Sequence, residues 1–198
     1  MTEWWTYRLS SFLLFSPRIY WRLVESYNRD IWPAQAVALG AGIVLLWLAA
    51  VPRYGGARIV AAILALAWSS VGWAFHWQRY ATINWAATYF AVAFWVEALL
   101  LILLGVFRPG RPAPEPSRRQ RILGLTLAVG GLLLYPLSSL PAGRPWAQAE
   151  VFGAMPEPTG LATLGLLLAG GRPHAKWLCV LPVLSLALGM ATLWLLSS

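Results

Sequence analysis

The sequence predicts an all-α, polytopic membrane protein with about six transmembrane helices, an N-terminal interfacial amphipathic helix and a broken fifth helix. Hydrophobic residues make up 59% of the 198 residues and charged residues only 11%, and the mean hydropathy of +0.62 exceeds that of ordinary soluble proteins. Several apolar runs reach the length of about 20 residues that a helix needs to cross a bilayer. Thirteen tryptophans and seven tyrosines are typical of chains with many residues at the membrane interface.

Residues 1–32 are too charged to cross a membrane, and we expect them to form an interfacial segment. Ser16 followed by Pro17 is a typical helix start, with serine as the N-cap and proline at the first helical position. Basic and apolar side chains then alternate with the period of a helix, which indicates a helix lying in the plane of the interface. Its basic face offers a surface for anionic lipid headgroups or for a partner protein, and consists of Arg18, Arg22 and Arg29.

Residues 33–198 form the predicted six-helix transmembrane domain, with spans at about 33–51, 58–75, 83–107, 122–140, 146–171 and 177–196. The fifth span is the difficult one, because Thr159 to Gly171 supplies only about a dozen apolar residues. In the favoured interpretation, Trp146 to Met155 is the first half of a helix that is broken between Pro156 and Pro158, because proline lacks a backbone donor and restricts the residue before it. In the alternative, residues 141–159 are an interfacial loop and Thr159 caps a short helix.

The distribution of basic residues gives an orientation. The loops after the first, third and fifth spans carry nine lysines and arginines, whereas those after the second and fourth carry only Arg79 and Arg144. The positive-inside rule therefore predicts periplasmic termini, although four arginines before the first span argue the other way. The net charge of +8 is attributed to topology and anionic lipids, and nucleic acid is not an expected partner. Parity places the N-terminal helix, the His76 corner and residues 143–160 at the same face.

Two acidic residues are the main candidates for chemistry inside the membrane. Glu97 lies near the middle of the third span, where an ionisable side chain costs a few kcal/mol and is by default a functional candidate. If the fifth helix is broken as described, Glu157 and Thr159 lie at a similar depth, and two carboxyl groups there would form a cation or proton site. The plainer interpretations are a protonated Glu97 bonded to a neighbouring helix and a Glu157 exposed in a loop.

Other polar side chains are expected to shape the outer mouth of such a site. A polar cap on the third span consists of His76, Arg79, Tyr80 and Asn84. Arg79 is expected to pair with Glu150 or with a lipid headgroup. Metal binding is not expected, because the two histidines fall on opposite faces. No catalytic residues are predicted, and the sequence names no cofactor.

Three stretches carry a resemblance to a known family: FSPRIYWRLVESYNRDIWPAQ, FHWQRYATINWAATYFAVAFWVEALLL and WAQAEVFGAMPEPTGLATLGLLLA. Together they resemble a family of small bacterial inner-membrane proteins of unknown function. The resemblance implies six helices and a place in the bacterial inner, or cytoplasmic, membrane, and it brings no established activity. In that family a cysteine often stands between the two prolines, where this chain has Glu157. This difference argues against thiol-based metal chemistry and leaves a carboxylate that suits a harder cation.

The leading functional hypothesis is a small transporter or channel-like protein for a cation, a proton or a small solute. Glu97 and residues 156–159 would line the path, and His76, Arg79 and Glu150 would shape its mouth. The chief rival is a non-catalytic accessory or structural subunit of a larger membrane complex. The partners expected besides membrane lipids are further copies of the chain in a homo-oligomer or the members of such a complex. A lipid-binding or lipid-modifying protein that uses the arginine-rich interfacial helix is a third hypothesis.

Overall fold

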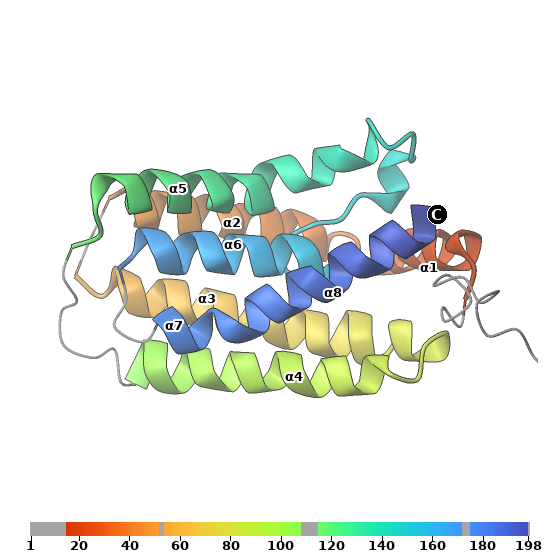
Figure 1. Ribbon diagram of the computed structural model, residues 1–198, viewed down its shortest axis with the longest axis horizontal. Coiled ribbons are helices and arrows are strands. Elements are labelled where there is room, and N and C mark those ends of the chain that lie inside the picture. The colour runs from red at the N-terminus through yellow and green to blue at the C-terminus, as the bar shows by residue number, and fades with distance from the viewer. Residues whose placement is uncertain (1–14, 52–53, 108–114, 172–174, 198) are drawn as a thin grey trace, which may run out of the picture.

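The computed structural model describes residues 15–51, 54–107, 115–171 and 175–197, and the regular structure in these ranges is entirely helical (Figure 1). The α-helices are α1 (Pro17–Asp30), α2 (Ala34–Ala50), α3 (Gly56–Ser70), α4 (Ala87–Leu100), α5 (Arg118–Val129), α6 (Pro156–Ala169), α7 (Ala175–Leu178) and α8 (Val180–Ser197). Shorter π or 3₁₀ segments are η3 (Val71–Trp77), η4 (Tyr80–Thr82), η5 (Leu101–Phe107), η6 (Gly130–Leu134), η7 (Tyr135–Ser139) and η8 (Trp146–Gln148). The all-α prediction is therefore confirmed.

Four of the described helical stretches are long and apolar enough to cross a membrane, namely Gly56–Thr82, Ala87–Phe107, Arg118–Ser139 and Ala175–Leu196. The pair α1 and α2 qualifies as a fifth when taken together, although the chain bends by 85° between them. Helix α6 has 14 residues, or about 21 Å, which is too short to cross alone. The expected count of six is thus approximate.

The first half of the expected broken helix is not helical. Only Trp146–Gln148 form a single 3₁₀ turn, and the chain then runs as a loop in which Gly153 has a φ of +74°. Pro156 occupies the first position of α6, after an extended Met155. The two prolines therefore begin a helix instead of interrupting one, because the first turn has no use for the backbone donors that proline lacks. The alternative of a loop followed by a short helix is closer to the structure, although the helix begins before Thr159.

The helices form a bundle in which α8 crosses the others obliquely (Figure 1). Helix α6 lies inside it, packed mainly on α5 and α8. Its contact with α5 is close because glycines face the partner backbone: a Cβ placed on Gly165 would lie 2.6 Å from the carbonyl oxygen of Gly124. Small residues at helix interfaces are the usual means of close packing in membranes. This packing fixes where α6 begins, and hence where Glu157 lies.

One end of the bundle collects α1, the turn before α4, the loop of residues 140–155 and the C-terminal end of α8 (Figure 1). The parity of the predicted spans also places the first three of these segments at one face. Helix α1 is capped as expected, since the hydroxyl of Ser16 accepts a hydrogen bond from the backbone N–H of Ile19 at 3.4 Å. Its apolar face, with Tyr20, Val24 and Tyr27, is buried against the protein. Its exposed basic side chains are Arg18, Arg22 and Arg29.

Candidate functional site

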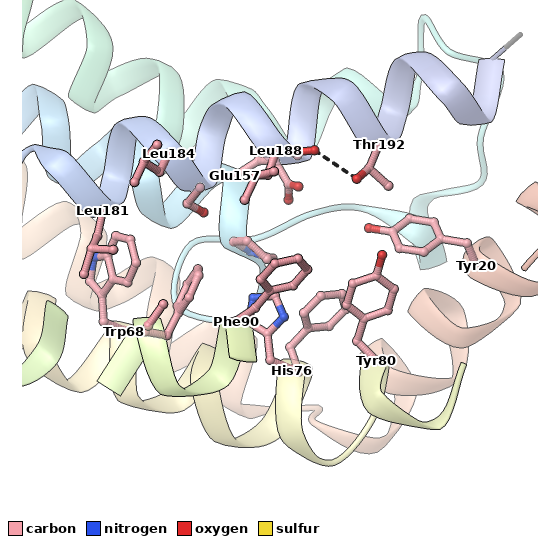
Figure 2. Close-up of a pocket in the computed structure, with 16 residues that line it drawn as sticks. Tyr20, Trp68, His76, Tyr80, Phe90, Glu157, Leu181, Leu184, Leu188 and Thr192 are labelled. Atoms are coloured by element: carbon pink, nitrogen blue, oxygen red, sulfur yellow. Dashed lines mark hydrogen bonds between the residues drawn. The ribbon is translucent and has the colours of Figure 1, made fainter. Parts of the chain in front are cut away.

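A partly open cavity of about 160 Å³ lies among η3, α4, the start of α6 and α8. Most of its wall is aromatic or aliphatic, and Glu157 and His76 are its ionisable side chains apart from two tyrosines. Figure 2 shows both turned toward the cavity, with Glu157 beneath α8 and His76 rising from the opposite wall. The lining residues are Tyr20, Trp68, Phe75, His76, Tyr80, Phe90, Ala93, Phe94, Pro156, Glu157, Leu181, Leu184, Ser185, Leu188, Gly189 and Thr192.

Glu157 is the acidic residue of this cavity. It lies in the first turn of α6, its exposed fraction is 4%, and its Oε2 atom has no hydrogen-bond partner. Space for the carboxyl group comes from α8, because any Cβ on Gly189 would collide with Oε1 of Glu157. An unpartnered buried carboxylate is costly. The position is therefore one where a proton or a bound cation lowers the free energy.

The start of α6 offers almost no hydrogen-bond donors to the cavity. The first backbone N–H groups of a helix have no partner within it, and such groups commonly bind anions. Here Pro156 and Pro158 remove two of them, and the side chain of Glu157 interacts with its own N–H. This arrangement satisfies a helix start that is buried in the bundle. It also leaves few backbone donors for an anion at this end of the cavity.

His76 lies on the π-helical segment η3, with 4% exposure and neither ring nitrogen hydrogen-bonded. Aromatic rings surround it; those of Phe94 and Phe75 have centroids 4.6 Å and 5.2 Å from the imidazole. Unpartnered buried nitrogens are uncommon and call for an explanation. A ligand or a water molecule in the cavity would supply one, and π-helical segments are frequent at functional sites.

Glu97 occupies a different place from Glu157. It is completely buried on α4, and neither carboxyl oxygen has a hydrogen-bond partner. It is not among the residues that line the cavity, and it lies within electrostatic reach of Cys179. The structure therefore does not bring the two predicted carboxyl groups into one cavity.

The loop before α6 carries an ion pair between Arg144 Nη2 and Glu150 Oε2 at 3.1 Å. Glu150 is only 1% exposed, and its pKa is raised above the ordinary value of 4.5 because burial outweighs the opposing effect of Arg144. The Arg144 guanidinium also stacks on the Trp21 ring, 3.8 Å from its centroid. Arg79, for which Glu150 or a headgroup was the expected partner, instead pairs with Asp30 at 2.6 Å. This pair forms where α1 packs against η3, as in the contact between the Tyr27 and Phe75 rings, whose centroids are 5.6 Å apart.

Helix α1 supplies the hydrogen bonds that hold the same loop. Asn28 donates to the carbonyl oxygens of Ala147 and Ala149, each at 2.9 Å, and Tyr27 donates to that of Ala154 at 3.2 Å. Thr159 closes the loop from the other side, accepting from the N–H of Gly153 at 2.9 Å. Thr159 thus acts in positioning the start of α6 and does not line the cavity.

The remaining predicted residues divide between the cavity and its surroundings. Tyr80 lines the cavity, and Figure 2 shows its hydroxyl turned toward that of Tyr20. Asn84 lies outside, and its side-chain oxygen accepts from the N–H of Ala86 at 3.0 Å. No group of three or more metal-ligating side chains occurs in the described ranges. Sequence reasoning missed the aromatic wall itself; the high tryptophan and tyrosine content was the available signal, and it had been assigned wholly to the interface.

Comparison with known proteins identifies a family. The family model of DUF6064, a family of unknown function, matches residues 17–197, so the chain belongs to this family. No curated protein and no solved structure matches the chain significantly.

Proposed function

We propose that this DUF6064 protein is a multi-pass protein of the bacterial inner membrane that takes up a proton or a small cation at Glu157 and acts as a small transporter. One observation carries the proposal: Glu157 is 4% exposed, has an unpartnered carboxyl oxygen, and lines a cavity that is not fully enclosed. Burying an unpaired charge is costly in an apolar setting. The carboxyl group consequently binds either a proton or a cation, and exchange between the two is the elementary step of coupled transport.

The surroundings of Glu157 support a path toward one end of the bundle. The cavity extends from Leu181 on α8 to Tyr20 on α1, which lies at the end that carries the loop of residues 140–155 (Figure 1). The hydroxyl groups of Tyr20 and Tyr80 and the imidazole of His76 are polar positions on this side. The periplasmic placement of this end stays a prediction from the arginine count.

A flux assay with matched variants tests the proposal. The protein is reconstituted in liposomes containing a pH-sensitive dye, and proton movement is driven by a potassium diffusion potential. Glu157→Gln should abolish the protein-dependent flux, because glutamine cannot exchange a proton. Glu97→Gln is the matched control, since Glu97 is also buried and unpartnered but lies outside the cavity. Flux that survives Glu157→Gln, or that is lost only in Glu97→Gln, would overturn the assignment.

The accessory-subunit hypothesis gives a different outcome in the same preparation. A subunit without transport activity would produce no flux in any variant and would copurify from its native membrane with a stoichiometric partner. Purification in mild detergent followed by mass measurement of the intact complex distinguishes the two. An isolated chain or a homo-oligomer with Glu157-dependent flux supports the transporter.

A further inference from the structure

We infer that the cavity is built for a small organic ammonium ion of about the size of one aromatic ring, bound between Glu157 and the surrounding aromatic side chains. This inference rests on the proposed function and names the substrate class of the same site. It joins three independent features of the cavity: its aromatic wall, the sign of its charge and its volume.

The aromatic wall is the first feature. Six of the lining residues have aromatic side chains, namely Tyr20, Trp68, Phe75, Tyr80, Phe90 and Phe94. Aromatic faces attract organic cations through the ring quadrupole, most strongly when water is excluded, and cages of this kind are a recurrent way of binding ammonium groups. Several of these rings are held by their neighbours; the Trp68 and Phe94 centroids are 4.3 Å apart, and the Trp68 indole donates to Thr163 at 2.9 Å. The wall is therefore preformed.

The sign of the charge is the second feature. Glu157 is the acidic lining residue, and no lysine or arginine lines the cavity in the described part of the chain. Pro156 and Pro158 remove two of the backbone N–H groups that could bind an anion at the start of α6. The unpartnered Oε2 atom of Glu157 and one nitrogen of a neutral His76 are acceptors. The cavity therefore suits a positively charged ligand. Such a ligand can donate hydrogen bonds to these acceptors, or it can bind without making any.

Volume and ligand number distinguish an organic cation from a metal ion. A cavity of about 150 Å³ accommodates benzene, and this one has about 160 Å³. A dehydrated divalent cation requires about six oxygen ligands, whereas the polar wall consists of one carboxyl group, one imidazole and four hydroxyl groups, and the hydroxyl of Thr192 already donates to Leu188 at 2.9 Å. A ring-sized ammonium ion fills the space and needs only one opposite charge.

The position of α8 gives a ligand access to the cavity from the bilayer. Leu184 and Leu188 line the cavity, yet each is 51% exposed. The cavity therefore reaches the outer surface of the bundle beside α8, on a helix whose apolar length qualifies it to cross a membrane. An amphiphilic ammonium ion partitions to such a surface, so it can reach Glu157 without first passing through water.

A proton and the ammonium ion compete for the same carboxyl group, so binding weakens as the pH falls. Several other groups face Glu157 from the elements packed around it, and they modulate this competition: Tyr20 of α1, Tyr80, His76 of η3, Tyr135 of η7, and the Arg144–Glu150 pair of the loop. A permanently charged ligand does not titrate, so the pH dependence of its binding reports on ionisable groups of the protein alone.

The test measures binding of choline, a permanently charged ammonium ion of about ring size, to the purified full-length protein by isothermal titration calorimetry, with 3,3-dimethyl-1-butanol as the uncharged ligand of the same shape. We expect the cation to bind and the neutral analogue to bind at least about tenfold more weakly. Glu157→Gln should weaken binding of the cation about 30-fold or more, as expected when one partner of a buried charge pair is removed. Phe90→Leu should weaken it by about two- to fivefold, the range for a single cation–π contact, and should leave the neutral analogue unaffected.

Two further variants distinguish a loss of ligand binding at the site from a general loss of folding. Gly189→Ala keeps the acid but displaces its carboxyl group, and it should weaken binding as Glu157→Gln does. Glu97→Gln removes an equally buried acid outside the cavity and should bind the cation with the affinity of the parent protein. Loss of affinity that is equal in Glu97→Gln and Glu157→Gln would overturn the site.

The outcomes separate the substrate class from the proposed function. If choline does not bind, or binds equally to Glu157→Gln, while proton flux still depends on Glu157, the organic-cation inference fails and the transporter stands. If the cation binds through Glu157 but liposomes show no flux, the inference stands and transport fails. Equal affinity for the neutral analogue would also refute the inference, because the site would then recognise only apolar shape.

Discussion

The close contact between α5 and α6 makes a sharp prediction about Gly124 and Gly165. A Cβ placed on Gly165 would lie 2.6 Å from the Gly124 carbonyl oxygen, and one placed on Gly124 would lie 2.7 Å from that of Gly165. Ordinary contact begins at 3.4 Å, so the helices must separate by close to 1 Å. A gap of about 0.5–1 Å removes a quarter to a half of the dispersion attraction across an interface, and overpacking typically costs about 1–3 kcal/mol.

We therefore expect Gly165→Ala to lower the free energy of unfolding by about 2 kcal/mol, even after the gain of about 0.5–1 kcal/mol from replacing a helical glycine. For a chain of this length the melting temperature should fall by about 4–8 °C, as measured by tryptophan fluorescence in detergent. Gly40→Ala on α2 is the control, because a Cβ there meets nothing within 4 Å and should be neutral or stabilising. A rise in melting temperature for Gly165→Ala like that of Gly40→Ala would refute the close packing. The double Gly124→Ala/Gly165→Ala variant should lose less than the sum, since one displacement relieves both clashes.

Three further predictions concern buried polar contacts. Thr163→Val keeps the side-chain volume but leaves the buried Trp68 indole N–H without its acceptor, and thermal denaturation should show a loss of about 1–3 kcal/mol. Asn28→Asp removes both donors to the loop of residues 140–155, and hydrogen exchange should accelerate in that loop but not in α5. Arg144→Gln leaves Glu150 buried without its cation, so the pKa of Glu150, already raised, should rise further. A raised carboxyl pKa gives a stabilisation that is present at low pH and is lost as the pH rises through the folded-state value. Both proteins lose it above pH 4.5, so the deficit of Arg144→Gln relative to the parent should open only above the already raised folded-state pKa of Glu150 in the parent, and Glu150→Gln in the same chain should remove this pH dependence.

Local signals in the sequence were sufficient for the helical class and for α1. Ser16 and Pro17 define a helix start through properties of those two residues alone, and the structure places the start there. Arginine positions on α1 follow from helical periodicity, and they are exposed as that periodicity requires. These features depend on neighbours within about four positions, so no knowledge of tertiary packing was needed.

The start of α6 shows what local signals could not decide. Pro156 and Pro158 are equally compatible with a break inside a helix and with the first turn of one. The choice depends on residues 149–155, whose backbone groups bond to α1, more than 100 positions away in the sequence. Likewise, a place inside the membrane for Glu97 could be expected from its position in an apolar span. The depth of Glu157 was tied to a broken helix that the structure does not contain, and the separation of the two carboxyl groups depends on how α4 and α6 pack. The aromatic wall was missed because its members come from α1, α3, η3, η4 and α4 and show no common motif.

The same contacts explain how a charged side chain is kept at the start of a buried helix. Pro156 and Pro158 lack backbone N–H groups, which would otherwise be buried away from water at the start of α6. The side chain of Glu157 interacts with the N–H of the same residue. The preceding loop depends on Tyr27 and Asn28 of α1 for hydrogen bonds to its carbonyl groups. Helix α1 also lies on the surface with its arginines exposed. The position of the Glu157 carboxyl group is therefore coupled to the packing of this amphipathic surface helix on the bundle. Any change that lifts α1 from the bundle must therefore also loosen the cavity, even though α1 contributes only Tyr20 to its lining.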